Sequence, residues 1–258
     1  MAGSALESTL RRDRWLVVAA LVLVAVLTLG YTYWLATGFD MSGMMSPEYV
    51  PWSRGYFLFM LAMWVVMMIG MMTPSVAPTI LLYAEFARRA SSRGHVFASA
   101  AWFAAGYLLA WSLFALAATL LQWLLEKWAL VTPMMAGTSR TLGGWTLIAA
   151  GVYQWLPLKQ ACLSQCRSPL SFIQRQGGFR PGASAAMLLG LKHGGYCIGC
   201  CWMLMVLLFA FGVMNLRWIA GLMVFVLLEK LVPRAGWFSR AAGVAAVIAG
   251  IRMMNGAG

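Results

Sequence analysis

The sequence predicts an all-α fold, a polytopic bundle of about seven transmembrane helices. Of the 258 residues, 62% are hydrophobic and only 10% are charged, whereas soluble domains carry about 25% charged residues. Charge-free runs of up to 30 residues recur along the chain, and a helix needs about 20 apolar residues to cross a bilayer. Such a chain cannot cover a water-facing surface, so the lipid bilayer is its expected partner.

The chain divides into a short basic segment, residues 1–14, and one transmembrane helical domain, residues 15–254. The first apolar run, residues 15–36, follows three arginines but is too long for the apolar core of a signal peptide. It also ends in aromatic residues instead of a small-residue cleavage site. We therefore expect it to be a retained signal anchor.

Charged residues divide the rest of the domain into further apolar segments. Pro74 and Pro78 are expected to bend the second span in its later half. Residues 181–191 are apolar, and the Lys-His-Gly-Gly sequence at 192–195 then interrupts the pattern. This interruption predicts a broken or re-entrant helix before the fifth span. The expected spans are residues 15–36, 55–84, 96–125, 141–158, 196–216, 218–232 and 237–254.

Positive charge is distributed unevenly between alternate loops. With seven spans, 13 Lys and Arg lie on the side of the N-terminus and five on the opposite side. By the positive-inside rule the N-terminus is therefore expected to be cytoplasmic. These loops account for the net charge of +12. Because no basic face interleaved with aromatics is present, no nucleic-acid partner is expected.

Some of the methionines are regularly spaced along the sequence. Met63, Met67 and Met71 are spaced four residues apart in the second predicted span, so their thioethers line one helix face. Thioether sulfur is a soft donor that suits Cu(I), although methionine also fills irregular gaps in helix packing. The loop before this span holds three more methionines, Met41, Met44 and Met45.

The five cysteines form two groups. Cys162 and Cys166 are four apart in the basic loop after the fourth predicted span. The other three fall within about a third of a helix circumference, and they are Cys197, Cys200 and Cys201. If the fifth span starts near residue 196, both groups lie at the cytoplasmic boundary, with His193 as a nearby nitrogen donor.

Converging thiolates favour Cu(I), zinc or an iron–sulfur cluster, and the soft methionines favour copper. Two other interpretations remain open: the cysteines pack as small hydrophobic residues, or a disulfide joins the groups, which a cytoplasmic position disfavours. The predicted metal ligands are Cys162, Cys166, Cys197, Cys200, Cys201, His193, Met63, Met67 and Met71.

Three charged residues lie near predicted membrane boundaries. Lys192 is expected to snorkel to the interface. Glu229 and Lys230 are either functional residues within a span or a local pair at a helix end.

Several motifs together resemble a known family. They are MMTP at 71–74, Tyr-Gln at 153–154, CLSQCRSP at 162–169, GGYCIGCCWMLM at 194–205 and Glu-Lys at 229–230. Over residues 56–251 the chain resembles a bacterial domain-of-unknown-function family described as predicted metal-binding integral membrane proteins. The resemblance implies a multi-pass protein of the bacterial inner membrane with a metal site at the cysteines, and it implies no particular reaction.

The functional hypothesis is Cu(I) handling, by transport or delivery, through the Met-lined helix to the cysteine cluster. No Ser-His-Asp grouping or phosphate-binding loop is present, so no catalytic residues are assigned and an enzyme is not the expected class. One alternative is a membrane thiol–disulfide oxidoreductase, with Cys197 and Cys200 activated at the start of a helix. Another is a non-catalytic subunit of a membrane complex, and a homo-oligomer is a further partner to consider.

Overall fold

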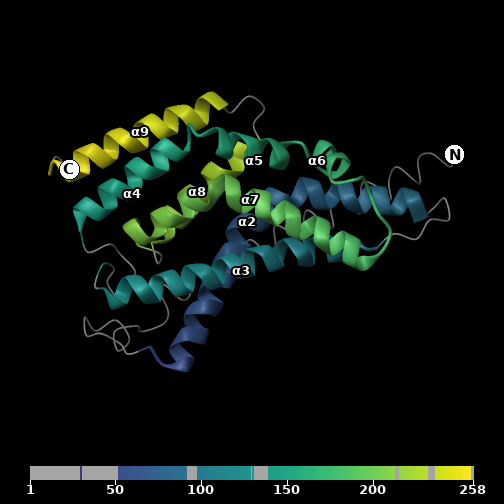
Figure 1. Cartoon of the computed structure of the whole chain (residues 1–258), viewed down its shortest axis with the longest axis horizontal. Helices are drawn as coiled ribbons and strands as arrows, with labels where there is room; N and C mark the ends of the chain where they lie inside the picture. The colour runs from purple at the N-terminus through teal and green to yellow at the C-terminus, as the bar shows by residue number, and fades with distance from the viewer. Residues whose placement is uncertain are drawn as a thin grey trace.

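The computed structural model describes Gly30 and residues 52–91, 98–128, 130, 139–212, 215–231 and 236–256. Within these residues the chain forms helices and no strands, so the all-α prediction is confirmed (Figure 1). Apart from Gly30, the first predicted span lies outside the described residues, as do Met41, Met44 and Met45. The helices are α2 (Arg54–Ser91), α3 (Ala100–Lys127), α4 (Arg140–Tyr153), α5 (Pro157–Arg167), α6 (Pro169–Arg175), α7 (Ala183–Phe211), α8 (Leu216–Leu231) and α9 (Gly236–Met254).

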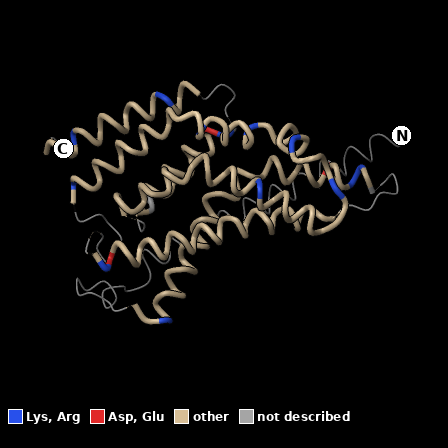
Figure 2. Tube along the Cα trace, in the orientation of Figure 1, with Lys and Arg blue, Asp and Glu red and all other residues tan. Residues whose placement is uncertain are grey.

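Three of these helices, α2, α3 and α7, are long and apolar enough to cross a membrane, with mean hydropathies of 2.0, 1.9 and 2.0 over their most apolar windows. The helices α4, α8 and α9 have 14, 16 and 19 residues, fewer than the roughly 20 that cross a bilayer without adjustment. The seven-span prediction is therefore not confirmed. Figure 2 shows that the long helix α3 carries its charged residues at one end.

The helix α2 continues through both of its prolines, Pro74 and Pro78. Figure 1 shows that it changes direction along its length, as the two prolines predict, since each removes a backbone donor. The hydroxyl of Thr73 donates to the carbonyl oxygen of Ile69 at 2.6 Å. The bend lets one helix pack against α3 and also against α8.

The break predicted at Gly194 and Gly195 is wrong, because α7 runs without interruption from Ala183 to Phe211. A Cβ on Gly194 would overlap the side chain of Ala110 and lie 3.3 Å from the carbonyl oxygen of Tyr107 on α3. The glycine therefore serves close helix packing, which small residues permit in membrane-type interfaces. Burial of the helix among its neighbours offsets the cost of about 0.5–1 kcal/mol for each helical glycine.

Two other glycines hold α3 and α7 together at the same interface. A Cβ on Gly106 would overlap the carbonyl of Met187, and a Cβ on Gly190 would overlap the carbonyl of Phe103. On the other side of the molecule α4 packs on α9 in the same way (Figure 1). Glycines therefore set the positions of the helices around the interior.

The predicted fourth span, residues 141–158, is interrupted. Helix α4 ends at Tyr153, and α5 begins at Pro157 after an extended residue, Leu156. Proline disfavours helical backbone in the residue before it, which explains where the chain turns. The predicted basic loop that follows is instead the pair of helices α5 and α6, and α5 packs against α7.

Candidate metal centre

Three thiols project from one side of α7 into the protein interior. Cys197, Cys200 and Cys201 are 1%, 2% and 1% exposed, because residues three and four apart share a helix face. The thiols of Cys200 and Cys201 each donate to the carbonyl oxygen of Cys197, at 3.0 Å and 2.9 Å. The three sulfur atoms are thus gathered within one turn of helix.

The other two cysteines lie on α5, and the packing of α5 on α7 brings them to the same place. The thiol of Cys166 is buried and interacts with the thiols of Cys197 and Cys200. These neighbouring thiols, together with burial, raise the pKa of Cys166 well above its ordinary value. The Sγ of Cys162 would lie 2.8 Å from a Cβ on Gly199, so it rests directly on the α7 backbone.

The position of this cluster along α7 differs from the sequence-based expectation. Because α7 begins at Ala183 and not near Tyr196, the cysteines lie close to the middle of a 29-residue helix. The prediction that they mark the edge of a span is therefore wrong. The idea that Cys197 and Cys200 open a helix and gain reactivity from its dipole is wrong for the same reason.

One buried ammonium group contacts the cluster. The Nζ of Lys230 on α8 lies 2.8 Å from the Sγ of Cys197 and 2.9 Å from the Oγ of Ser75 on α2. The hydroxyl of Tyr107 on α3 is 3.1 Å from the same sulfur atom. Cations and hydrogen-bond donors beside a sulfur favour the thiolate, which is the form that binds metals.

The neighbouring Glu229 does not form a local pair with Lys230, so that interpretation is wrong. Its carboxylate accepts from the Nζ of Lys159 on α5, at 2.8 Å to each oxygen. Lys159 is fully buried and Glu229 is 1% exposed, and the ammonium also binds the side chain of Gln154. Glu229 of α8 therefore holds α5 through an ion pair, and the adjacent Lys230 contacts the Cys197 sulfur atom of α7.

His193 lies one helical turn before Cys197, on the same face of α7. It is 2% exposed and is surrounded by the rings of Phe103, Tyr107 and Phe172. Its Nδ1 has no hydrogen-bond partner within the part of the chain that the structure describes. A free ring nitrogen beside the thiols is an additional donor of the kind that copper and zinc accept.

The methionines of α2 are buried in the core and extend toward the thiols. Met63, Met67 and Met71 are 8%, 4% and 2% exposed. The carbonyl oxygen of Met72 accepts from the Tyr107 hydroxyl at 3.2 Å, and that hydroxyl also contacts Cys197. At about 1.5 Å rise per residue, the nine steps from Met63 to Met72 cover about 14 Å.

Among the described residues, no three His, Cys, Asp or Glu side chains are already grouped as they would be around a metal ion. All five cysteines are free thiols, so no disulfide joins the two groups. Sequence reasoning missed Lys159 and Tyr107 as neighbours of the site. Lys230 could be recognised as a candidate because it is a charged residue in an apolar segment. Nothing in the local sequence marks Lys159 or Tyr107.

The fold and the site together define a class: a protein that is helical throughout its described residues, with four buried thiols, a fifth that is partly buried, a buried histidine and the ammonium group of Lys230 beside them. The sequence model of the PpoB2 family, described as copper chaperone, matches residues 61–253. The chain therefore belongs to that family, which supports copper handling in general and a metal ion as its partner. No curated protein and no solved structure matches the chain.

Proposed function

We propose that this protein is an integral membrane copper chaperone that holds Cu(I) between α5 and α7. The observation that carries the proposal is the packing of α5 on α7, which buries Cys166 near Cys197 and Cys200, with Lys230 2.8 Å from the Cys197 sulfur. Thiolate is a soft ligand, and Cu(I) is a softer ion than Zn(II). Cys162, Cys201 and His193 are the neighbouring donors to which the ion can move.

The charge balance of this buried site favours a Cu(I) complex with few thiolate ligands. One Cu(I) and two thiolates carry a single net negative charge, and an uncompensated charge in a buried site is costly. The ammonium of Lys230 supplies one compensating charge at 2.8 Å from Cys197. The charge of Lys159 is already balanced by Glu229. A four-thiolate zinc site would carry two negative charges and would exceed this compensation.

The Met-lined face of α2 is the proposed route to the thiols. Thioethers bind Cu(I) more weakly than thiolates, so an ion passed along Met63, Met67 and Met71 moves toward tighter ligands. In this scheme the outer loop methionines deliver the ion, and the N-terminus lies in the cytoplasm of a bacterial cell. Three helices of sufficient length and the buried methionines support the scheme.

Loading the purified protein with Cu(I) under anaerobic conditions tests the copper site. Titration against a chromophoric Cu(I) chelator is expected to give one tightly held ion per chain, and X-ray absorption at the copper edge should show sulfur in the first coordination shell. Zinc at equal concentration should not displace it. A first shell of nitrogen and oxygen alone, or tighter binding of zinc, would refute the proposal.

Replacing Met63, Met67 and Met71 together with leucine tests the route. Leucine conserves volume, so the cost to stability should stay below about 1.5 kcal/mol for each substitution. Copper held at equilibrium should be unchanged, whereas the rate of Cu(I) loading in proteoliposomes should fall about tenfold or more. The control is Met223→Leu on α8, a methionine outside the route. Equal loading rates in the two variants would show that the α2 methionines only fill the core.

A further inference from the structure

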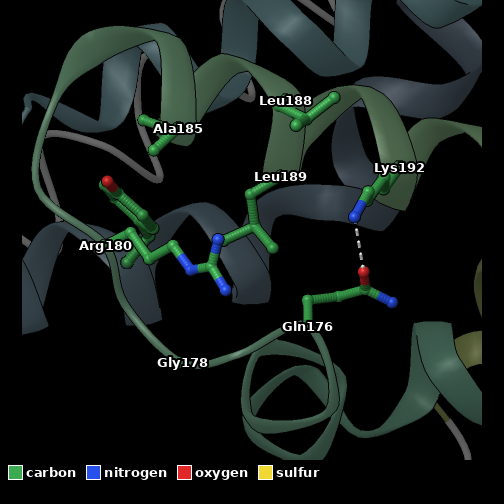
Figure 3. A pocket seen from close by; sticks show the side chains of 9 residues that line it. Gln176, Gly178, Arg180, Ala185, Leu188, Leu189 and Lys192 are labelled. Atoms are coloured by element: carbon green, nitrogen blue, oxygen red, sulfur yellow. Dashed lines mark hydrogen bonds between the residues drawn. The ribbon is translucent and has the colours of Figure 1, made fainter.

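A small basic cleft lies at the other end of α7, away from the thiols. Its volume is about 70 Å³, and its wall includes Arg180, Lys192, Gln176 and Tyr83. Figure 3 shows the guanidinium of Arg180 directed toward the middle of the cleft, beside Leu189, with Lys192 on the farther side. None of the residues that line the cleft is acidic, so its charge is not compensated from within.

The start of α7 adds to this positive potential. No side chain caps the first turn of this described helix, which begins after Gly182 and contains no acidic residue in that turn. Uncapped N–H groups at a helix start carry about half a positive charge and bind anions. Ala185 and Ala186 of the first turns belong to the wall of the cleft.

The side chain of Tyr83 provides the independent indication of a ligand. It is 1% exposed, and it reaches the cleft from α2. Its hydroxyl has no hydrogen-bond partner among the residues that the structure describes. Buried hydroxyls are normally hydrogen-bonded, and an anion in the cleft would accept from this one.

The remaining wall is fixed in place and partly apolar. Lys192 donates to the side-chain oxygen of Gln176 at 3.0 Å, and the Arg180 guanidinium lies against Gly177, whose φ of +91° requires glycine. Leu188, which is 52% exposed, lies at the edge of the cleft. Figure 2 shows several Lys and Arg at the end of the molecule where α2 ends and α7 begins.

We propose that this cleft binds a phosphate group, held by Arg180, Lys192, the Tyr83 hydroxyl and the start of α7. Arginine binds phosphate through two parallel hydrogen bonds, and the cleft is of a size for a group of this kind. The phosphate belongs either to an anionic lipid headgroup, whose acyl chains would lie along Leu188, or to free phosphate. The site is separate from the copper-binding thiols.

Thermal unfolding of the full chain, followed with two probes, tests the site. The first probe is inorganic phosphate added to protein in a neutral detergent. The second is phosphatidylglycerol, at about one fifth of the lipid in phosphatidylcholine nanodiscs, compared with phosphatidylcholine alone. A rise in Tm with phosphate identifies the free ion as a ligand, and a rise with phosphatidylglycerol only identifies the headgroup.

Two variants of the cleft and one control make the test specific. Arg180→Gln should weaken binding of the effective probe about tenfold or more. Tyr83→Phe should weaken it about threefold to tenfold, yet leave the Tm without the probe equal or higher, because it removes an unpartnered buried hydroxyl. Arg175→Gln, on α6 and outside the cleft, should bind as the wild type does.

Three results would overturn the assignment. One is the absence of a Tm rise with either probe. Another is an equal loss in Arg175→Gln and Arg180→Gln, which would indicate nonspecific attraction to the basic end of the molecule. The third is unchanged binding in Tyr83→Phe, which would show that the hydroxyl faces no anion.

Discussion

Replacing Cys197, Cys200 and Cys201 with serine is expected to abolish copper retention. These residues supply three of the five thiols on α5 and α7, and serine retains the approximate size and the hydrogen bond to the residue 197 carbonyl but not the soft sulfur. Removing an outer-shell partner of a metal ligand already costs 10–100-fold in affinity, so removing the ligands should cost more than about 100-fold. Copper per chain, measured by elemental analysis after chelator dialysis, provides the readout.

The single variant Cys166→Ser tests whether α5 supplies a copper ligand in addition to those of α7. If copper bridges α5 and α7, this change alone should lower affinity by at least about tenfold and remove one sulfur from the X-ray absorption signal. Met223→Leu, which alters a sulfur atom on α8, serves as the control and should retain the wild-type copper content. Retention of copper by the triple serine variant, with an unchanged Tm, would contradict the proposed site.

Replacing Lys159 with methionine is expected to cause a large loss of stability. It leaves the Glu229 carboxylate buried without its cation, since Arg167 donates to the Glu229 backbone oxygen. Breaking a buried ion pair in this way typically costs about 3–5 kcal/mol. The same change frees α5, which carries Cys162 and Cys166, so copper affinity should fall as well. Thermal and denaturant-induced unfolding in detergent measure the stability.

The double variant Lys159→Met/Glu229→Leu distinguishes a lost ion pair from lost packing. An apolar replacement of both partners is often neutral, so most of the stability should return. Lys127→Met, at an exposed position at the end of α3, is the control and should change the free energy of unfolding by less than about 0.5 kcal/mol. A double variant as unstable as Lys159→Met would show that the side chain of Lys159 acts mainly by filling space.

Local sequence was a good guide where a feature depends on neighbouring residues. Charge-free runs predicted the long helices α2 and α3 and the later part of α7, and the four-residue spacing placed Met63, Met67 and Met71 on one buried face. Local sequence gave a wrong prediction at Gly194 and Gly195, because a glycine pair considered by itself indicates a helix break. In the folded chain Gly194 is a contact point for α3, and packing outweighs the low helix propensity.

The sequence by itself determined that this protein is helical, strongly apolar and rich in soft sulfur ligands, because composition and periodicity act within a single helix. Only the tertiary structure decided that Cys166 meets Cys197 in the middle of α7 and that Lys230 lies against that sulfur. It also decided that Glu229 pairs with Lys159 instead of its neighbour. The contacts of Lys230 with Cys197 and of Glu229 with Lys159 join residues 33 and 70 positions apart. Only the packing of α5 and α8 against the rest of the bundle brings such distant residues together.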